Sequence, residues 1–150
     1  MVEPDLEEVR VFLGAHHTLT LATVGSHGEP QAVDLYYAML EGMRICFISG
    51  SSSRHSANIA RDGRVACTIH AVSTRWRDIC GIQIEGTCAR LTALEEARAW
   101  SRYIVRFPFV ISDSPLRAAL DGVNLYCITP RWLRWIDNSI GLGHKVEYQL

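Results

Sequence analysis

The chain has 150 residues, of which 48% are hydrophobic and 21% are charged, and its formal net charge at pH 7 is −1. This length and composition are typical of one globular domain, 1–150, with a substantial core. The near-neutral charge argues against a general nucleic-acid binder or a binder of anionic membranes, because both need a strongly basic surface.

The sequence shows no targeting or membrane signal. Its acidic start, Met1 to Glu8, lacks the basic region and the apolar stretch of a signal peptide. No apolar run approaches the roughly 20 residues that a membrane helix needs. We therefore expect a cytoplasmic protein.

Cysteine and histidine spacing argues against disulfides and metal binding. The five cysteines form no C-x-x-C pair, and each lies in an apolar, strand-like run. Such residues are typically buried, reduced thiols. The six histidines form no H-x-x-x-H or Cys/His cluster, so no metal site is predicted.

Hydrophobic spacing along the chain predicts many strands and a few helices. Acidic residues in the first turn and helical spacing predict a short N-terminal helix that starts behind Pro4-Asp5. Alternating or continuous apolar runs predict strands at Thr18–Val24, Ala32–Ala38, Met43–Ser49, Val65–Ala71, Ile79–Leu91, Leu125–Ile136 and Lys145–Tyr148. Further helices are expected at Arg54–Ala60, Thr92–Arg106 and Ser114–Leu120.

The connections between these strands favour an antiparallel fold. Short turns join several of them, and a parallel, doubly wound sheet needs longer crossovers. Gly81 and Gly86 lie inside the long strand Ile79–Leu91, which indicates bends or bulges of a curved sheet. We predict a mainly β fold, a small antiparallel β-barrel with appended helices.

A run of hydroxyl residues separates one predicted strand from a predicted helix. The run is Ser49-Gly-Ser-Ser-Ser53, and Arg54 follows it directly. Backbone N–H groups, hydroxyls and a guanidinium at a helix start are the groups that bind a phosphate. The same residues also fit a polar turn in which Ser53 caps the helix and Arg54 is solvated. These residues alone leave both interpretations open.

Three further side chains are candidates for ligand contacts. Asp34 is a polar residue in an apolar strand and faces either the barrel exterior or a ligand. Gln83 lies on the opposite strand face from Ile82 and Ile84, so it faces either solvent or a ligand. Trp135 fits core or interface packing as well as a cofactor contact. The spacing yields no Ser-His-Asp or Cys-His constellation, so nothing supports hydrolytic chemistry.

Five short motifs occur in order between residues 18 and 148. They are Arg54-His55-Ser56, Gly81-x-Gln83, Arg106-Phe-Pro108, Ile136-Asp-Asn138 and Gly143-His-Lys145. In this order, the features of residues 18 to 148 resemble the pyridoxamine 5'-phosphate oxidase-like, FMN-binding split-barrel superfamily, and within it a small bacterial, YhbP-like branch. The resemblance implies a homodimer with FMN lying across the subunit interface.

The resemblance also implies three groups of flavin contacts. One group holds the phosphate at the hydroxyl run, one lies on the strand that runs along the isoalloxazine ring, and one comes from the later strands. In chain order, the implied residues are Asp34, Leu35, Tyr36, Ser49, Ser53, Arg54, His55, Gln83, Trp135 and Lys145.

Three features depart from the oxidase pattern. His55 stands where the oxidases have Lys, which implies a pH-dependent cation. Gln83 is two residues nearer to Gly86 than the oxidases' flavin-contacting Gln, on the same strand face. Gly141 and Gly143 stand where the oxidases have a substrate-binding Arg and His. Pyridoxamine phosphate oxidation is therefore not expected.

The sequence leads to two main functional hypotheses. The first is a flavin-dependent oxidoreductase that binds FMN and acts on a small-molecule redox substrate. The second is a non-catalytic protein of the same fold that carries FMN, haem or a deazaflavin. In the haem case, His55, His70 or His144 could ligate the iron. A scaffold that has lost its cofactor is a third hypothesis.

Overall fold

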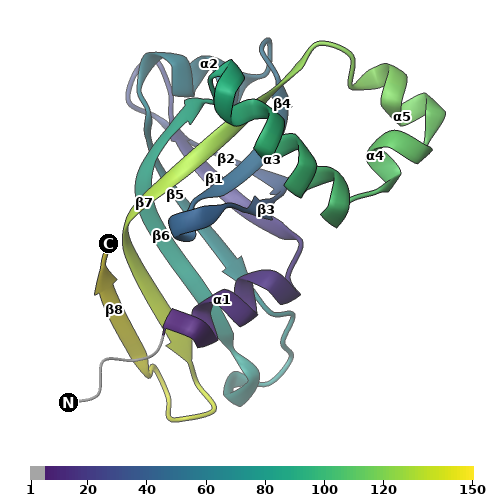
Figure 1. The fold of residues 1–150 in the computed structure, drawn as a ribbon. Coiled ribbons are helices and arrows are strands. Elements are labelled where there is room, and N and C mark those ends of the chain that lie inside the picture. The colour runs from purple at the N-terminus through teal and green to yellow at the C-terminus, as the bar shows by residue number, and fades with distance from the viewer. Residues whose placement is uncertain (1–5) are drawn as a thin grey trace.

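The computed structural model describes residues 6–150, in which an antiparallel sheet curls into a half-barrel with helices around it (Figure 1). The strands are β1 (Thr18–Val24), β2 (Pro30–Tyr36), β3 (Ala38–Met39), β4 (Ile45–Gly50), β5 (Arg64–His70), β6 (Cys80–Arg90), β7 (Val123–Asp137) and β8 (Lys145–Gln149). The helices are α1 (Leu6–Ala15), η1 (Glu41–Met43), α2 (Arg54–Arg61), η2 (Trp76–Asp78), α3 (Ala93–Arg106), α4 (Phe109–Ser112) and α5 (Ser114–Ala119). Helix α1 confirms the short N-terminal helix predicted behind Pro4-Asp5; these two residues themselves lie outside the described residues.

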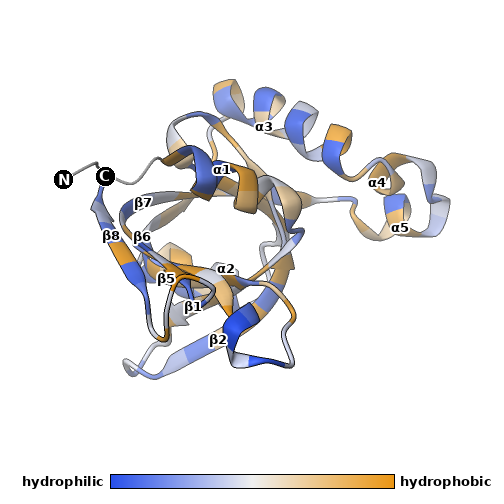
Figure 2. Cartoon of the chain, turned by 90° about the horizontal axis from the view of Figure 1, so that it is seen from below, coloured by the Kyte–Doolittle hydropathy of each residue, from blue (hydrophilic) through white to orange (hydrophobic). Residues whose placement is uncertain are grey.

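All the strand pairs in this sheet are antiparallel. The order is β2-β1-β5-β6-β7-β4-β3, and β8 pairs with β7. Seen from below in Figure 2, the strands curl around a centre, with α1 across one side and α3 to α5 outside the ring. This arrangement confirms the predicted antiparallel β-barrel with appended helices.

Gly86 allows the close pairing of the two longest strands. The register between β6 and β7 shifts between Glu85 and Gly86. A Cβ atom at Gly86 would overlap the carbonyl oxygen of Thr129 on β7. The bend that the sequence predicts inside the strand Ile79–Leu91 is therefore present, and glycine is needed there.

Two hydrophobic cores lie on the two sides of the sheet. The barrel interior is filled by alternate strand residues, and α1 adds Val9, Phe12 and Leu13 to it. The second core lies between the sheet and α3 and α4, and includes Tyr103 and Phe107. The fully buried side chains of the barrel include Leu19, Leu21, Phe47, Ile82, Ile84, Ile128 and Leu133.

The structure differs from the prediction around β3. The predicted strand Met43–Ser49 begins only at Ile45, because Gly42 and Met43 both have positive φ values, 68° and 64°. Tyr37 separates β2 from β3, since its N–H donates to the carbonyl of His17 at 3.0 Å. The short helices η1, η2 and α4 were not predicted. No helix among residues 6–150 is long and apolar enough to span a membrane.

Candidate functional site

Three serine hydroxyls and one imidazole form a hydrogen-bonded cluster where β4 ends and α2 begins. Ser49 Oγ lies 2.6 Å from His55 Nε2 and 3.0 Å from Ser53 Oγ. Ser53 Oγ accepts from the N–H of Ser56 at 3.2 Å, donates to Ser56 Oγ at 2.7 Å, and lies 3.2 Å from His55 Nε2. Ser53 is thus the N-cap of α2, as one of the two sequence interpretations states.

His55 contacts the hydroxyls of Ser49 and Ser53 from a buried position. Its side chain is buried, and its ring packs beside Phe47 with the centroids 6.4 Å apart. Burial lowers the pKa of His55 below its ordinary value, which favours the neutral ring over the cation that the resemblance implies. The Nε2 atom of His55 contacts the hydroxyls of both Ser49 and Ser53.

Arg54 supplies the positive charge beside this cluster. It is the first residue of α2, and 63% of its side chain is exposed. Its guanidinium lies 3.6 Å from the carboxylate of Glu29 in the β1–β2 turn. Backbone N–H groups of that turn, with a smaller effect from Arg54, lower the pKa of Glu29. An exposed ion pair of this length is weak, so Arg54 can exchange Glu29 for a ligand anion.

Helix α2 is attached firmly to the barrel, which fixes the position of its N-terminus. Asn58 Nδ2 donates to Thr23 Oγ1 on β1 at 2.9 Å, and both side chains are buried. Arg61 donates to the carbonyl of Val24 at 2.7 Å. The first-turn N–H groups of a helix lack intrahelical partners. In α2 the N–H of Ser56 is capped by Ser53 Oγ, which leaves the N–H groups of Arg54 and His55 beside the hydroxyls of Ser49 and Ser53.

The predicted residues on β2 alternate between the two faces of the sheet. Asp34 and Tyr36 are exposed on the outer face, whereas Leu35 packs against the barrel core. Thr20 on β1 donates to the Asp34 carboxylate at 2.6 Å. Asp34 therefore lies on the exterior face of the sheet.

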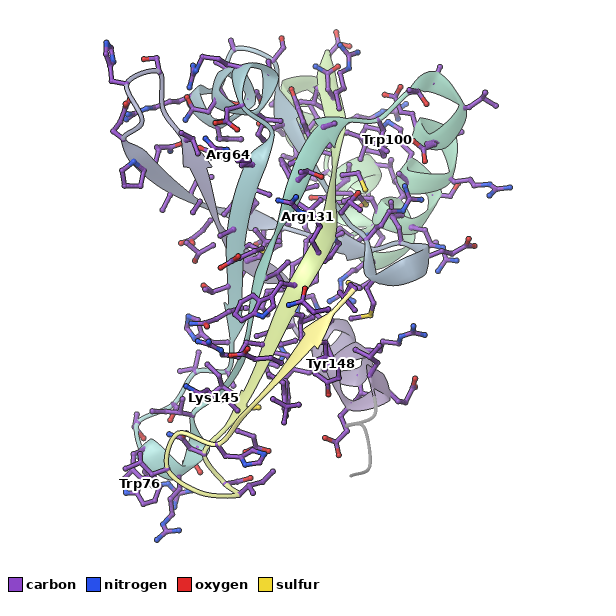
Figure 3. All side chains as sticks on the ribbon, turned by 90° about the vertical axis from the view of Figure 1, so that its left-hand side faces the viewer. Arg64, Trp76, Trp100, Arg131, Lys145 and Tyr148 are labelled. Carbon is purple, nitrogen blue, oxygen red and sulfur yellow. The ribbon has the colours of Figure 1, made fainter. Side chains whose placement is uncertain are left out.

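A polar network crosses the outer face of β6, β7 and β8. Arg134 donates to Gln83 Oε1 at 3.2 Å and to Glu147 Oε1 at 2.6 Å. Its guanidinium also lies over the Trp132 ring, 4.9 Å from the centroid. Hydrogen bonds from Arg134 lower the pKa of Glu147. Lys145 is exposed on β8, two residues before Glu147 and on the same face (Figure 3).

Trp135 lies on the opposite face of β7, inside the barrel. Only 8% of it is exposed, and its ring meets Phe12 of α1 edge-on, with the centroids 5.0 Å apart. The predicted site residues therefore occupy three places within one chain. Ser49, Ser53, Arg54 and His55 form the phosphate candidate; Asp34, Tyr36, Gln83 and Lys145 lie on the outer sheet face; Leu35 and Trp135 belong to the core.

Sequence reasoning missed three participants. Ser56 extends the hydroxyl cluster, and its place three residues after the N-cap is the signal that could have identified it. Glu29 beside Arg54, and Arg134 beside Gln83, are contacts between segments distant in sequence. The local sequence around each residue does not predict contacts with such distant segments.

Among the described residues, neither a metal site nor a reactive cysteine is present. No group of three or more His, Cys, Asp or Glu residues within 6–150 could hold a metal ion. All five cysteines are free, and burial raises the pKa of both Cys46 and Cys67 to about 12. Such thiols stay protonated and are poor nucleophiles.

Two proteins with similar sequences come from enterobacteria. A protein of Yersinia pseudotuberculosis named UPF0306 is 30% identical over 146 residues, which cover 96% of this chain and 92% of that protein. A Klebsiella pneumoniae protein of the same name is 28% identical over 102 residues. That match covers 68% of this chain and 64% of the Klebsiella protein, slightly less than two thirds of its length.

Solved structures share the fold. A heme binding protein from Mycobacterium smegmatis has a TM-score of 0.80 at 21% identity, covering 99% of this chain and 60% of that one. HutZ, the heme storage protein from Vibrio cholerae, has a TM-score of 0.69 at 16% identity, covering 83% and 88%. The profile of the family described as "Pyridoxamine 5'-phosphate oxidase" matches residues 6–136, and the chain therefore belongs to this family of split β-barrel proteins.

Proposed function

We propose that the chain binds FMN and acts as a flavin-dependent oxidoreductase on a small molecule. The observation that carries the proposal is the hydroxyl cluster at the N-terminus of α2, with Arg54 beside it. Ser49 and Ser53 would hydrogen-bond the FMN phosphate, the first turn of α2 would add N–H donors, and Arg54 would neutralise the charge. His55 would keep the two hydroxyls in place.

A second copy of the chain would complete the site. Asp34, Tyr36, Gln83 and Lys145 lie on the outer sheet face. Tyr36, at the end of β2, also packs against Phe107 and Phe109 next to α3 and α4. The strands β6, β7 and β8 of this face are turned to the viewer in Figure 3, with no helix in front of them. We infer that this face packs against a second protomer. FMN would then contact the hydroxyl cluster of one protomer and the outer sheet face of its partner.

The residues present limit the chemistry. FMN, when bound, supplies hydride transfer between a donor and an acceptor. The chain's own residues would bind, orient and shield the cofactor, and His55 beside the hydroxyl cluster is buried with its Nε2 bonded to Ser49. Glycines at Gly141 and Gly143 remove the polar contacts expected for pyridoxamine phosphate, so that substrate is not proposed.

Haem binding is the second candidate function. Two structurally similar proteins are named for heme binding or heme storage. In this chain, His70 is exposed on the outer face of β5, and its Nδ1 lies 3.2 Å from the carbonyl of Ala71. A hydrogen bond donated by Nδ1 to this carbonyl leaves Nε2 available for iron, and ligating histidines usually donate their other ring N–H in this way. His55 is less suitable because both serines occupy its Nε2.

The visible spectrum of the purified protein separates the two candidates. We expect a flavin spectrum, or its appearance after incubation with FMN, and bleaching when a reduced nicotinamide is added anaerobically. Flavin binding without bleaching by any donor would support a carrier instead of an enzyme. A haem spectrum that His70→Ala abolishes, with no response to FMN, would contradict the flavin proposal.

We also propose that the protein is located in the cytoplasm. The free cysteines agree with this reducing compartment.

A further inference from the structure

A groove separate from the hydroxyl cluster runs between α3, η1 and α1. The part between α3 and η1 has a volume of about 670 Å³, and the part towards α1 has about 480 Å³. Leu40, Glu41 and Arg102 line both parts, so the two parts adjoin. None of the residues that line the groove belongs to the proposed phosphate site.

The groove carries an excess of positive charge. Arg44 is paired with Glu95 at 3.0 Å, and Arg106 donates to carbonyls at the end of α1, including that of Gly14 at 3.0 Å. The remaining arginines of the groove make no ion pair within residues 6–150. The five arginines and two glutamates that line it are Arg10, Arg44, Arg98, Arg102, Arg106, Glu41 and Glu95.

Two of the unpaired arginines share one face of α3. Arg98 and Arg102 are four residues apart, so their side chains are neighbours on the helix surface. Like charges at this spacing destabilise a helix slightly when nothing neutralises them. Two guanidiniums side by side offer several N–H donors to one carboxylate or phosphate group, which would remove this repulsion.

Apolar side chains line the same groove. Leu40 is partly buried and lies in both parts, and Ala99 of α3 is fully buried beside it. Leu94 and Val105, one at each end of the groove, are 90% and 83% exposed. Large apolar side chains exposed next to unpaired cations mark a surface that binds a ligand with both characters.

We propose that this groove binds an amphiphilic organic anion. Its carboxylate or phosphate would lie between Arg98 and Arg102, and its hydrocarbon part would lie along Leu40 towards Val105. This binding site is additional to the proposed FMN site and shares no residue with it. Each of the two parts has a volume within the range of small-molecule sites.

Nuclear magnetic resonance titration of the full chain tests this proposal, with octanoate and octyl phosphate as probes and octanol as the uncharged control. We expect saturable shifts of backbone amides in residues 40–44 and 94–106 with at least one anion. The double variant Arg98→Gln/Arg102→Gln should weaken that binding at least tenfold. Arg117→Gln, an exposed arginine on α5, is the matched control and should bind as the wild type does.

Three results would overturn the proposal: octanol binding as tightly as the anions, shifts confined to other segments, or unchanged affinity in the double variant. Both substituted side chains are exposed, so the double variant should fold. It should also bind FMN as the wild type does, because no proposed flavin contact is altered. Failure of the groove proposal is therefore distinguishable from failure of the flavin proposal.

Discussion

The buried imidazole of His55 gives the protein a pH-dependent stability. Because burial lowers its pKa in the folded chain, the unfolded chain takes up a proton first as the pH falls below about 6.5. The stabilising effect of the neutral ring is therefore complete above that pH and is lost as the pH falls. We expect the melting temperature to drop between pH 7.5 and pH 5.5.

The variant His55→Gln isolates this effect. Its melting temperature should depend less on pH over the same range, although it should be lower at pH 7.5 because the bonds to Ser49 and Ser53 change. His27→Gln, in the exposed β1–β2 turn, is the control and should keep the wild-type profile. Identical pH profiles for His55→Gln and the wild type would show that His55 is not buried and neutral.

Substitutions of Ser53 distinguish a helix cap from a phosphate ligand. Ser53→Ala should cost about 1 kcal/mol in the free energy of unfolding through loss of the N-cap. Ser53→Asp should retain most of that stability, because Asp is also a good N-cap and its charge suits a helix N-terminus. It should nevertheless bind FMN much more weakly than Ser53→Ala, because its carboxylate repels the phosphate. Unchanged FMN affinity in Ser53→Asp would leave Ser53 as a cap alone.

At the residue scale, the sequence predicted those side-chain positions that depend on neighbouring residues in the chain. The alternation of a strand placed Gln83 on the face opposite to Ile82 and Ile84, and the N-cap Ser53 was one of two interpretations of the hydroxyl run. The position of Asp34 was left open. The burial of His55 was not predictable, because it depends on Phe47 and Ser49 of a preceding strand. Arg134 was missed for the same reason, since its partner Gln83 is 51 residues away.

At the scale of elements, the bulge at Gly86 is the feature most sensitive to a single methyl group. Gly86→Ala would force the backbones of β6 and β7 apart at the carbonyl of Thr129. We expect a loss of about 1–3 kcal/mol in the free energy of unfolding, the usual cost of overpacking, measured by urea denaturation. Gly14→Ala in α1 is the control: no atom lies within 4 Å of the added methyl, and the stability should stay equal or rise. Equal losses in both variants would contradict this account of the bulge.

The elements themselves were largely predictable, and their ends less so. Strand alternation and helical spacing indicated every strand from β1 to β8 except β3, which the sequence joined to β2. The break at Tyr37 and the left-handed backbone at Met43 depend on tertiary contacts, because Tyr37 bonds to the α1–β1 segment through both its N–H and its hydroxyl. Local pattern alone does not reveal such breaks.

At the scale of the whole molecule, the account requires a dimer. Ala66 is exposed on the outer face of β5, within the face that we propose packs against a second copy. Ala66→Arg should leave the protomer folded, convert the dimer to a monomer at micromolar concentration and weaken FMN binding. Light scattering coupled to size-exclusion chromatography measures this change, with Ala118→Arg on α5 as the control. A wild-type monomer, or an Ala66→Arg variant that remains a dimer, would contradict the proposed interface.

The barrel class could be predicted from the pattern of short strands and turns, whereas the strand order could not. Periodicity does not specify that β7 pairs with β4 and β6, because those pairings join segments that lie far apart in the chain. The split-barrel identity came from the motifs around Arg54, Gly81 and Lys145, and the family match over residues 6–136 confirms it.

Titration of FMN into the wild type and Arg54→Ala, followed by flavin fluorescence, tests the central claim most directly. Loss of a charge-assisted contact should weaken binding by about 1.5–3 kcal/mol, or roughly 10- to 150-fold. Arg117→Ala, which removes an exposed arginine from α5, should bind FMN as the wild type does. Equal FMN affinity in Arg54→Ala and the wild type, or no FMN binding by the wild type, would contradict a phosphate site at the start of α2.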